Sequence, residues 1–430
     1  MAFPEIELPA DLPLNVPVRF EPKVSPSLLH NTQVKLSLAR FPEEQEDFGP
    51  DDWSQGAKVE RVRQLVQFWK TEYDWATREE AIQNTFDHYM VNLDVPDYGL
   101  VNLHFVYRKS GVQNTIPLLF CHGWPGSFLE SRYVLEPLTM SAKNGGPVFD
   151  VVVPSIPGFG FSPAPRKGGV GPSVVARAYK LLMSDVLGYR DGFVTQGGDF
   201  GSFISRSLAI QYPELVIAQH LNMFPVPPPT LLSAPLTYLR WCASFITYSS
   251  FEKEALKIRR NFELDQSGYL EQQKTRPQTL GFALGDSPLG LLAWFVEKFH
   301  DWVDVEGTAS LSNSDTIDLV MMHWIQGATP GLRFYREAFW GGKRDADDTF
   351  GVYVPAPTGV SMYAKEQLHC PRDWAAQAGN IVFWKEHATG GHFSSLERPE
   401  QFLQDMKDFV TTKAVKQSIS HHLGSDFIKF

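Results

Sequence analysis

Short runs of continuously apolar residues, separated by stretches with helical spacing, constrain the fold of this chain more than any other feature. Four of them, IPLLF, FDVVV, GFVTQ and VIAQH, lie between residues 101 and 224, and two more, in VYVPAPTGVSMYAKE and NIVFWKEH, follow residue 350. Strands that are apolar on both faces are typical of parallel sheets covered by helices on both sides. The pattern therefore predicts an α/β fold with a mainly parallel central sheet.

The segments before the first run have a different character. Residues 1–50 are rich in proline and lack sustained periodicity, so we expect them to run over a surface. The stretch KVERVRQLVQFWKTEYDW has apolar residues at helical spacing and predicts a helix. The stretch LVNLHFVYRKS alternates between apolar and other residues, which predicts a strand at the start of the sheet.

A long helical segment, residues 225–350, interrupts the alternation. Ser287 and Pro288 fit an N-cap and a first helical residue, and Gly327 fits a helix C-cap. Aromatic residues make up 13% of the chain, and many of them fall in this segment. A helical, aromatic-rich insertion between two strands of a parallel sheet predicts a lid. The chain is therefore divided into an N-terminal segment, the first part of the core, the lid, and the second part of the core with a tail: residues 1–100, 101–224, 225–350 and 351–430.

Charge and cysteine content restrict the partners and the compartment. A net charge of −10 without a dense basic run argues against a nucleic-acid-binding face. Cys121, Cys242 and Cys370 lie far apart without CxxC spacing, so neither a disulfide framework nor a zinc site is expected. The first twenty residues contain prolines, acidic residues and no long apolar run, which predicts neither a signal peptide nor a membrane anchor. We expect a reducing compartment, the cytoplasm.

The stretch QGGDFGS, between a predicted strand and a predicted helix, fits a turn that presents one side chain. In the pattern small-x-nucleophile-x-small, Asp199 occupies the nucleophile position. Gly197, Gly198 and Gly201 supply the small neighbours that such a strained turn needs. The alternative is a glycine-rich turn whose aspartate caps the next helix, and this stretch alone does not decide between them.

Two later motifs favour the nucleophile. The loop HGWPGS follows an apolar run and can aim a backbone N–H at an oxyanion, together with the N–H of Phe200. The loop GGHFSSLERP follows another apolar run and contains His392, which completes the chain order nucleophile, acid, histidine. Glu366 in the loop after the preceding strand is the favoured acid, and Asp373 is the alternative. A metal site at His387 and His392 is disfavoured, because neither HExxH nor a further ligand cluster accompanies them.

The motifs HGWPGS, GGDFGS, DSPLGLLAWFVEKF, RFYREAF and GGHFSSLERP, in this order, resemble those of epoxide hydrolases of the microsomal type, in the α/β-hydrolase superfamily. The similarity is greatest to the soluble fungal members, and it covers most of the chain, including RFPEE, DDWSQG and YDWATREEA. It implies an α/β-hydrolase core, a helical cap and an N-terminal meander that embraces both. It also implies a reaction without cofactor or metal, and a homodimer through cap surfaces.

Carried over by motif, the resemblance implies the roles of individual residues. Asp199 is the nucleophile, His392 the base and Glu366 the acid that orients it. Two cap tyrosines, Tyr269 in SGYLEQQKTRP and Tyr335 in RFYREAF, bind and protonate the epoxide oxygen. The HGxP motif contains a cis Trp-Pro peptide in this family, which helps to aim the Trp124 N–H into an oxyanion hole shared with Phe200. The motif comprises His122, Gly123, Trp124 and Pro125.

An epoxide substrate explains an aspartate at this turn. Attack by the Asp199 carboxylate opens the ring and forms an alkyl ester whose carbonyl belongs to the enzyme. Water activated by His392 can attack that carbonyl and release a vicinal diol, whereas a serine would leave a stable ether. The sequence leaves two rivals: a haloalkane or haloacid dehalogenase of the same fold, and a ligand-binding member without turnover. The tyrosine pair favours a small hydrophobic epoxide, and the sequence leaves detoxification and biosynthesis equally open.

Overall fold

The computed structural model describes residues 9, 12–49, 51–140, 146–304, 311–340 and 349–428. Within these residues the strands form one sheet in the order β1-β2-β3-β5-β4-β6-β7-β8-β9. The pairs β1–β2, β2–β3 and β3–β5 are antiparallel and the others are parallel, so the predicted mainly parallel α/β fold is confirmed. The strands are β1 (Val18–Arg19), β2 (His88–Val95), β3 (Gly99–Arg108), β4 (Ile116–Cys121), β5 (Phe149–Pro154), β6 (Phe193–Gly197), β7 (Val216–Leu221), β8 (Val354–Tyr363) and β9 (Gly379–His387).

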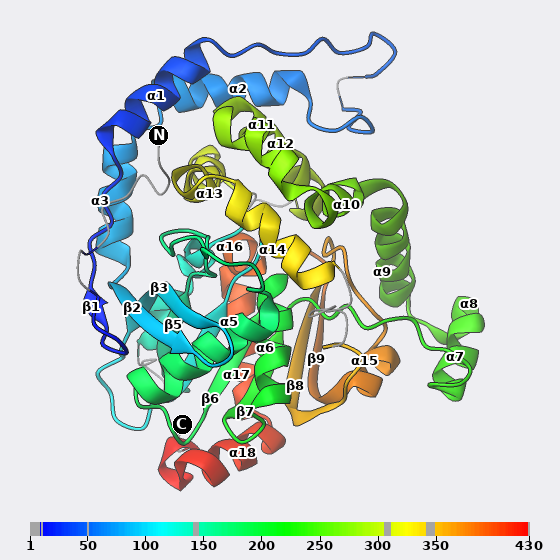
Figure 1. Cartoon of the computed structure of the whole chain (residues 1–430). Helices are drawn as coiled ribbons and strands as arrows, with labels where there is room; N and C mark the ends of the chain where they lie inside the picture. Colours follow the sequence, from blue (N-terminus) through cyan, green and yellow to red (C-terminus); the bar gives the residue numbers. More distant parts are fainter. Residues whose placement is uncertain are drawn as a thin grey trace.

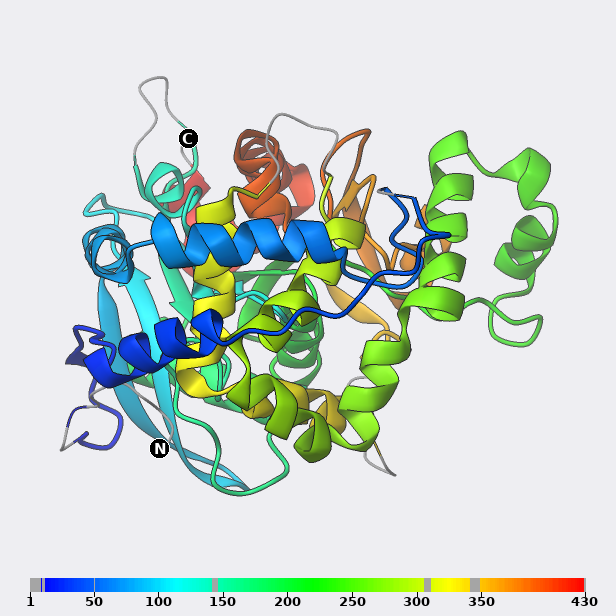
Figure 2. The same ribbon diagram turned by 90° about the horizontal axis from the view of Figure 1, so that it is seen from above.

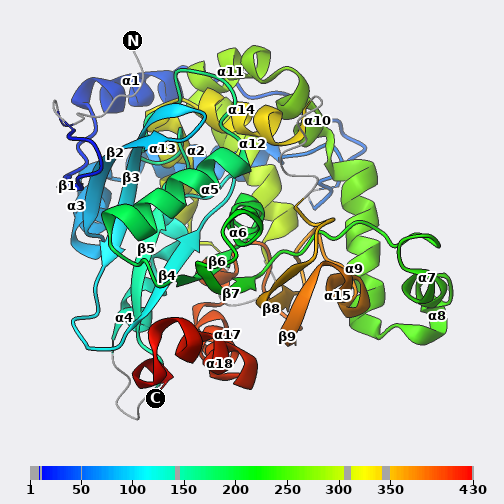
Figure 3. The ribbon, with the colours of Figure 1, turned by 60° about the horizontal axis from the view of Figure 1, so that its bottom comes forward.

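Helices cover both faces of the parallel part of the sheet. Every residue of β4, β6 and β7 is buried, which is why these strands have no polar alternation in the sequence. Figure 3 shows α5 and α6 on one side of the sheet and α17 and α18 on the other. The helices of the core are α4 (Leu135–Thr139), α5 (Pro172–Lys180), α6 (Phe200–Gln211), α15 (Arg372–Ala378), α16 (Ser394–Glu397), α17 (Pro399–Thr411) and α18 (Lys413–Leu423).

The predicted helical insertion lies between β7 and β8 and packs over the core beyond α6 (Figure 1). Its helix boundaries follow the sequence signals: the Ser287 hydroxyl accepts the Gly290 N–H at 2.9 Å at one helix start, and Gly327, with a φ of +76°, ends another. The cap helices are α7 (Pro235–Cys242), α8 (Ser244–Thr247), α9 (Ser250–Asn261), α10 (Gly268–Thr275), α11 (Pro277–Asp286), α12 (Pro288–Trp302), α13 (Asn313–Gln326) and α14 (Thr329–Phe339).

The N-terminal segment is more regular than its proline content suggests. The expectation that residues 1–50 only run over a surface is wrong for α1 (Pro26–Ser37), because Pro26 stands in the first turn, where a helix needs no N–H donor. The Thr32 hydroxyl accepts the indole N–H of Trp324 at 2.8 Å, which ties α1 to the cap. Figure 2 shows α1 and α2 (Val59–Thr71) lying across the cap helices, and α3 (Trp75–Thr85) follows. The division into four parts stays a prediction.

The strand predicted from the alternating stretch is β3, and it does not start the sheet. Strands β1 and β2 precede it, and β2 pairs with it along its whole length. The second half of β3 is buried on both faces because His104 and Val106 also point into the protein, where the His104 ring packs 5.1 Å from that of Phe128. Alternation in the sequence therefore described only the first half of this strand.

Among the described residues, no single helix is long and apolar enough to cross a membrane. One bent pair, α11 with α12 at 114°, meets the criterion by length and composition alone. The prediction that the N-terminus carries neither signal peptide nor anchor concerns in part residues 1–8, 10 and 11, which lie outside the described residues.

Candidate active site

Asp199 stands in a strained turn between β6 and α6. Its φ of +47° and ψ of −128° lie outside the regions that residues with a Cβ ordinarily adopt. The neighbouring glycines are required by close backbone approach: a Cβ on Gly201 would overlap the Cys121 carbonyl oxygen, and a Cβ on Gly198 would meet the Asn222 side chain. The side chain of Asp199 makes no capping hydrogen bond to α6, which removes the alternative interpretation of the turn as a helix cap.

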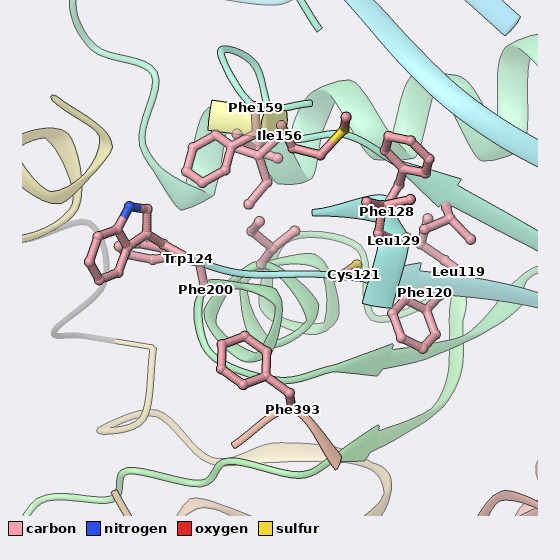
Figure 4. Close-up of a cluster of buried hydrophobic side chains, with 14 of the residues drawn as sticks. Leu119, Phe120, Cys121, Trp124, Phe128, Leu129, Ile156, Phe159, Phe200 and Phe393 are labelled. Atoms are coloured by element: carbon pink, nitrogen blue, oxygen red, sulfur yellow. The ribbon is translucent and has the colours of Figure 1, made fainter. Parts of the chain in front are cut away.

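Two backbone N–H groups point at the Asp199 carboxylate. The Trp124 N–H donates to Oδ1 at 2.7 Å, and the N–H of Phe200 also lowers the pKa of the carboxyl. The peptide between Trp124 and Pro125 is cis, as the resemblance implied. Gly123 is needed at its position, since a Cβ there would overlap Oδ1. Figure 4 shows Trp124, Phe200 and Phe393 within one cluster of buried hydrophobic side chains.

The remaining residues of the HGxP motif hold the loop in place. His122 is fully buried, and its Nε2 accepts the N–H of Ile156 at 3.1 Å. The Pro125 carbonyl accepts a hydrogen bond from His323 Nε2 of α13 at 3.2 Å. These contacts position the loop from the core on one side and from the cap on the other.

His392 lies on the opposite side of Asp199, with Glu366 behind it. His392 Nε2 is 3.6 Å from Asp199 Oδ2, and Nδ1 is 2.7 Å from Glu366 Oε2. The Trp302 carbonyl accepts the His392 N–H at 2.9 Å and fixes this loop against the end of α12. Of the two candidate acids, only Glu366 contacts His392, because the Asp373 carboxylate lies 3.5 Å from Arg240 instead.

His387 does not join His392 in a metal site. Its Nε2 lies 2.5 Å from Asp405 Oδ2, and its ring stacks on Tyr363 at 4.7 Å. Among the described residues, no group of three or more His, Cys, Asp or Glu side chains has the geometry to hold a metal ion. The structure therefore places the two histidines of this loop in separate networks.

Burial and charge shift the pKa values of the three buried groups in different directions. Burial raises the pKa of the Asp199 carboxyl. Burial alone would lower the pKa of His392, but the charges of Glu366 and Asp199 outweigh it and raise that pKa to about 9. Burial would raise the pKa of Glu366, and the charge of His392 reverses this and lowers it. The groups thus stabilise an imidazolium between two carboxylates.

Two tyrosines of the cap complete the site from above. Tyr269 of α10 stacks on Trp124, with ring centroids 5.4 Å apart. Tyr335 of α14 packs edge-on against Phe200 at 4.7 Å and against Tyr269 at 5.8 Å. Burial raises the pKa of both phenols well above 10, and the charge of Asp199 adds to the rise for each of them. Lys298 Nζ lies 4.6 Å from the centroid of the Tyr269 ring.

Sequence reasoning missed two residues beside this site. Trp302 packs its ring 4.9 Å from that of His392, and the only signal for it is its place at the end of the apolar run LLAWFVEKFHDW. Glu130 is near enough to Asp199 and His392 for each charge to affect its pKa. The signal for Glu130 was an acidic residue shortly after HGWPGS, next to Phe128 and Leu129.

Comparisons with known proteins show which families and proteins this chain is similar to. The family model "Epoxide hydrolase N terminus" matches residues 17–131, and the "alpha/beta hydrolase fold" model matches residues 116–236. Epoxide hydrolase 1 of Sus scrofa is 34% identical over 375 residues, 81% of this chain and 79% of the relative. Juvenile hormone epoxide hydrolase 1 of Ctenocephalides felis is 30% identical over 434 residues, 94% and 90% of the two chains.

A solved structure has the same overall arrangement. The structure of Aspergillus niger epoxide hydrolase matches with a TM-score of 0.76 and 29% identity, covering 92% of this chain and 95% of the other. The fold and the site define an α/β-hydrolase with a carboxylate at the nucleophile position. The chain belongs to the epoxide hydrolase family, and the resemblance stated from its motifs is confirmed.

Proposed function

We propose that this protein hydrolyses epoxides to vicinal diols through a covalent ester on Asp199. The observation that carries the proposal is the surroundings of the Asp199 carboxylate. Backbone N–H donors lie on one side of it, His392 lies on the other, and the two cap tyrosines lie above it. A carboxylate in this setting can act as a nucleophile and then as an electrophile within one cycle. The family membership supports the same reaction.

The first step is opening of the epoxide ring. The Asp199 carboxylate attacks an epoxide carbon, the carbon–oxygen bond breaks, and the leaving oxygen needs a proton. Tyr269 and Tyr335 both bind that oxygen, and Tyr269 donates the proton, because the Lys298 ammonium lies 4.6 Å from the centroid of its ring. The ammonium of Lys298 over the Tyr269 ring stabilises the negative charge that develops there.

The second step is hydrolysis of the ester. His392, oriented by Glu366, takes a proton from water, and the water oxygen attacks the Asp199 carbonyl carbon. The oxyanion forms on the aspartate oxygen that faces the Trp124 and Phe200 N–H groups. Collapse of the intermediate expels the diol oxygen, which takes the proton from His392. The proton left on the Asp199 carboxyl returns to the Tyr269 phenolate, so one epoxide and one water give one diol.

The finer description of substrate, partners and compartment belongs to the same proposal. The aromatic walls formed by Trp124, Tyr269 and Phe200 favour a small apolar epoxide. The net charge of −10 disfavours nucleic acid as a partner. The proposal includes a homodimer that forms through the cap. It also includes a cytoplasmic location, which the three free cysteines favour. The chain divides into meander, core and cap at residues 100, 224 and 350.

Product analysis tests the proposal. The purified chain is mixed with styrene oxide, and separately with a bromoalkane. We expect diol from the epoxide and no halide, and we expect Asp199→Ala and Glu366→Gln to abolish diol formation without loss of fold. Asp373→Asn, a change of the rival acid, serves as the matched control and keeps the activity. Halide release without diol would assign a dehalogenase, and neither product would assign a member without turnover on these compounds.

A further inference from the structure

Glu130 sits between the two loops that build the site. It lies in a single 3-10 turn, Phe128–Ser131, directly after the HGWPGS loop. Its Oε1 accepts the Gly123 N–H at 3.4 Å, and the next N–H along the chain, that of Trp124, binds Asp199. The Ser395 hydroxyl, three residues beyond His392, donates to the Glu130 carbonyl at 2.8 Å. The residue is therefore tied to both loops.

The backbone makes room for the carboxylate of Glu130. A Cβ on Gly126 would overlap its Oε1, so this glycine lets the side chain turn back along the loop toward Gly123. Residues of the same turn point elsewhere: Phe128 and Leu129 are buried in the apolar cluster of Figure 4. Glu130 is the one charged residue of this turn.

The protein compensates the charge of Glu130 only weakly. Its Oε1 accepts one long hydrogen bond, from the Gly123 N–H, whereas its Oε2 has no hydrogen bond to any described residue and no Lys or Arg of the described chain forms an ion pair with it. A half-buried carboxylate with so little compensation is costly, and a leucine or glutamine would fill the volume at lower cost. Glu130 keeps some accessible surface, as does the Asp199 side chain at 18%, so both have room for water.

We propose that Glu130 is a catalytic residue of the ester-hydrolysis step and binds the attacking water. Its Oε2 accepts a hydrogen bond from one O–H of the water, and the other O–H gives its proton to His392 Nε2. The water oxygen forms the new bond to the Asp199 carbonyl carbon, and Glu130 exchanges no proton. The proposal rests on the proposed function, because it assigns a role within the second step of that reaction.

The charge of Glu130 is coupled to both catalytic groups. Burial raises its pKa to about 8, the charge of His392 opposes this rise, and the charge of Asp199 adds to it. Such coupling requires that Glu130 lie near the space between His392 and Asp199, where the attacking water has to be held.

The test separates the two steps in one sample. Glu130→Gln, which keeps the shape and removes the charge, is mixed with styrene oxide, and alkyl-enzyme and diol are followed by quenched-flow and intact mass spectrometry. The matched control is Glu136→Gln, an exposed glutamate six residues further on. The ratio of the two rates within one sample is independent of the folded fraction, so a partly folded variant remains informative.

We expect alkyl-enzyme to accumulate in Glu130→Gln, with the hydrolysis rate at least about tenfold lower and the alkylation rate within about threefold of the wild type. Glu136→Gln should match the wild type in both rates. Equal loss of both rates in Glu130→Gln, or no change in hydrolysis, would overturn the role of Glu130. A wild type that forms neither alkyl-enzyme nor diol would instead contradict the proposed function itself.

Discussion

At the scale of single residues, the site depends on the coupling of three charges. The pKa of His392 is raised to about 9 because Glu366 and Asp199 stabilise its imidazolium. An imidazolium cannot take a proton from water, so the resting enzyme holds its base in the wrong form for the second step. Ester formation neutralises Asp199 and lowers the pKa of His392, so the ring releases its proton to the solvent and takes one back when the Asp199 carboxylate is restored. The first step therefore generates the base that the second step needs.

This coupling predicts the effect of neutralising Asp199. In Asp199→Asn we expect the pKa of His392 to fall below about 9, because one of the two charges that favour its protonated form is gone. The measurement is a pH titration of the histidine ring by NMR, with wild type and variant compared. An unchanged titration midpoint would show that Asp199 does not control the charge of His392.

Removal of the base separates the two steps of the reaction. His392→Gln leaves the Asp199 carboxylate able to open the ring but leaves no group to activate water. We expect the protein mass to rise by the mass of one epoxide and to stay raised. Mass spectrometry after mixing with styrene oxide checks this, and an unmodified mass would count against the assigned role.

At the scale of elements, the site is held by the turn between β6 and α6 more than by either element. This turn was predictable, because a positive φ at Asp199 and the close approach to Cys121 both demand glycine neighbours, which the sequence displays. The strands β4 to β7 were predictable for a similar reason, since nearly complete burial leaves a continuous apolar run. Helix α1 was not, because its prolines hide a buried face of residues spaced by four: Leu28, Thr32 and Leu36.

The close packing at the turn predicts a large cost for one added methyl group. Gly201→Ala places a Cβ against the Cys121 carbonyl, and we expect a loss of roughly 2–4 kcal/mol in the free energy of unfolding together with loss of diol formation. Gly285→Ala in α11 is the control, because a Cβ there meets nothing within 4 Å. That change should stabilise the protein by about 0.5–1 kcal/mol, as measured by urea unfolding.

At the scale of the whole molecule, a buried cluster of charges joins the N-terminal segment, the core and the cap. Asp318 of α13 is fully buried, and it lies 2.6 Å from Arg132 of the core and 2.5 Å from Arg78 of α3. The hydroxyl of Tyr73, before α3, donates to the same carboxylate at 2.8 Å. The cluster fixes the cap over the core, and with it the positions of the two tyrosines.

Removal of the central charge should therefore cost far more than removal of an exposed one. Asp318→Asn leaves the guanidinium groups of Arg132 and Arg78 with Asp315 as their remaining ionic partner, and we expect a loss of about 3–5 kcal/mol. Asp286 also bridges the N-terminal segment and the cap, through Lys35 at 2.6 Å, but its side chain is 82% exposed. Asp286→Asn should cost at most about 1 kcal/mol. Similar costs in urea unfolding would contradict the proposed role of the cluster.

The sequence revealed the site only in part, for physical reasons that differ by residue. Asp199 and His392 stand in loops with a recognisable local sequence pattern, so the sequence alone was enough to select them as candidates. Tyr269 and Tyr335 reach the site through cap packing, which no local pattern encodes, and only the resemblance identified them. Glu130 and Trp302 were missed because their local signals, an acidic residue shortly after HGWPGS and a tryptophan at the end of an apolar run, do not show which groups they meet. Their significance depends on which loops the fold brings together.

The covalent ester on Asp199 is the central claim, and a single turnover in ¹⁸O-labelled water tests it most directly. Enzyme in molar excess over styrene oxide is quenched after one turnover, and the diol and the peptide that contains Asp199 are analysed by mass spectrometry. Because water attacks the aspartate carbonyl, the account predicts label in the Asp199 carboxylate and none in the first diol. Label in the diol with none in Asp199 would mean that water attacks the epoxide directly, and it would contradict the account.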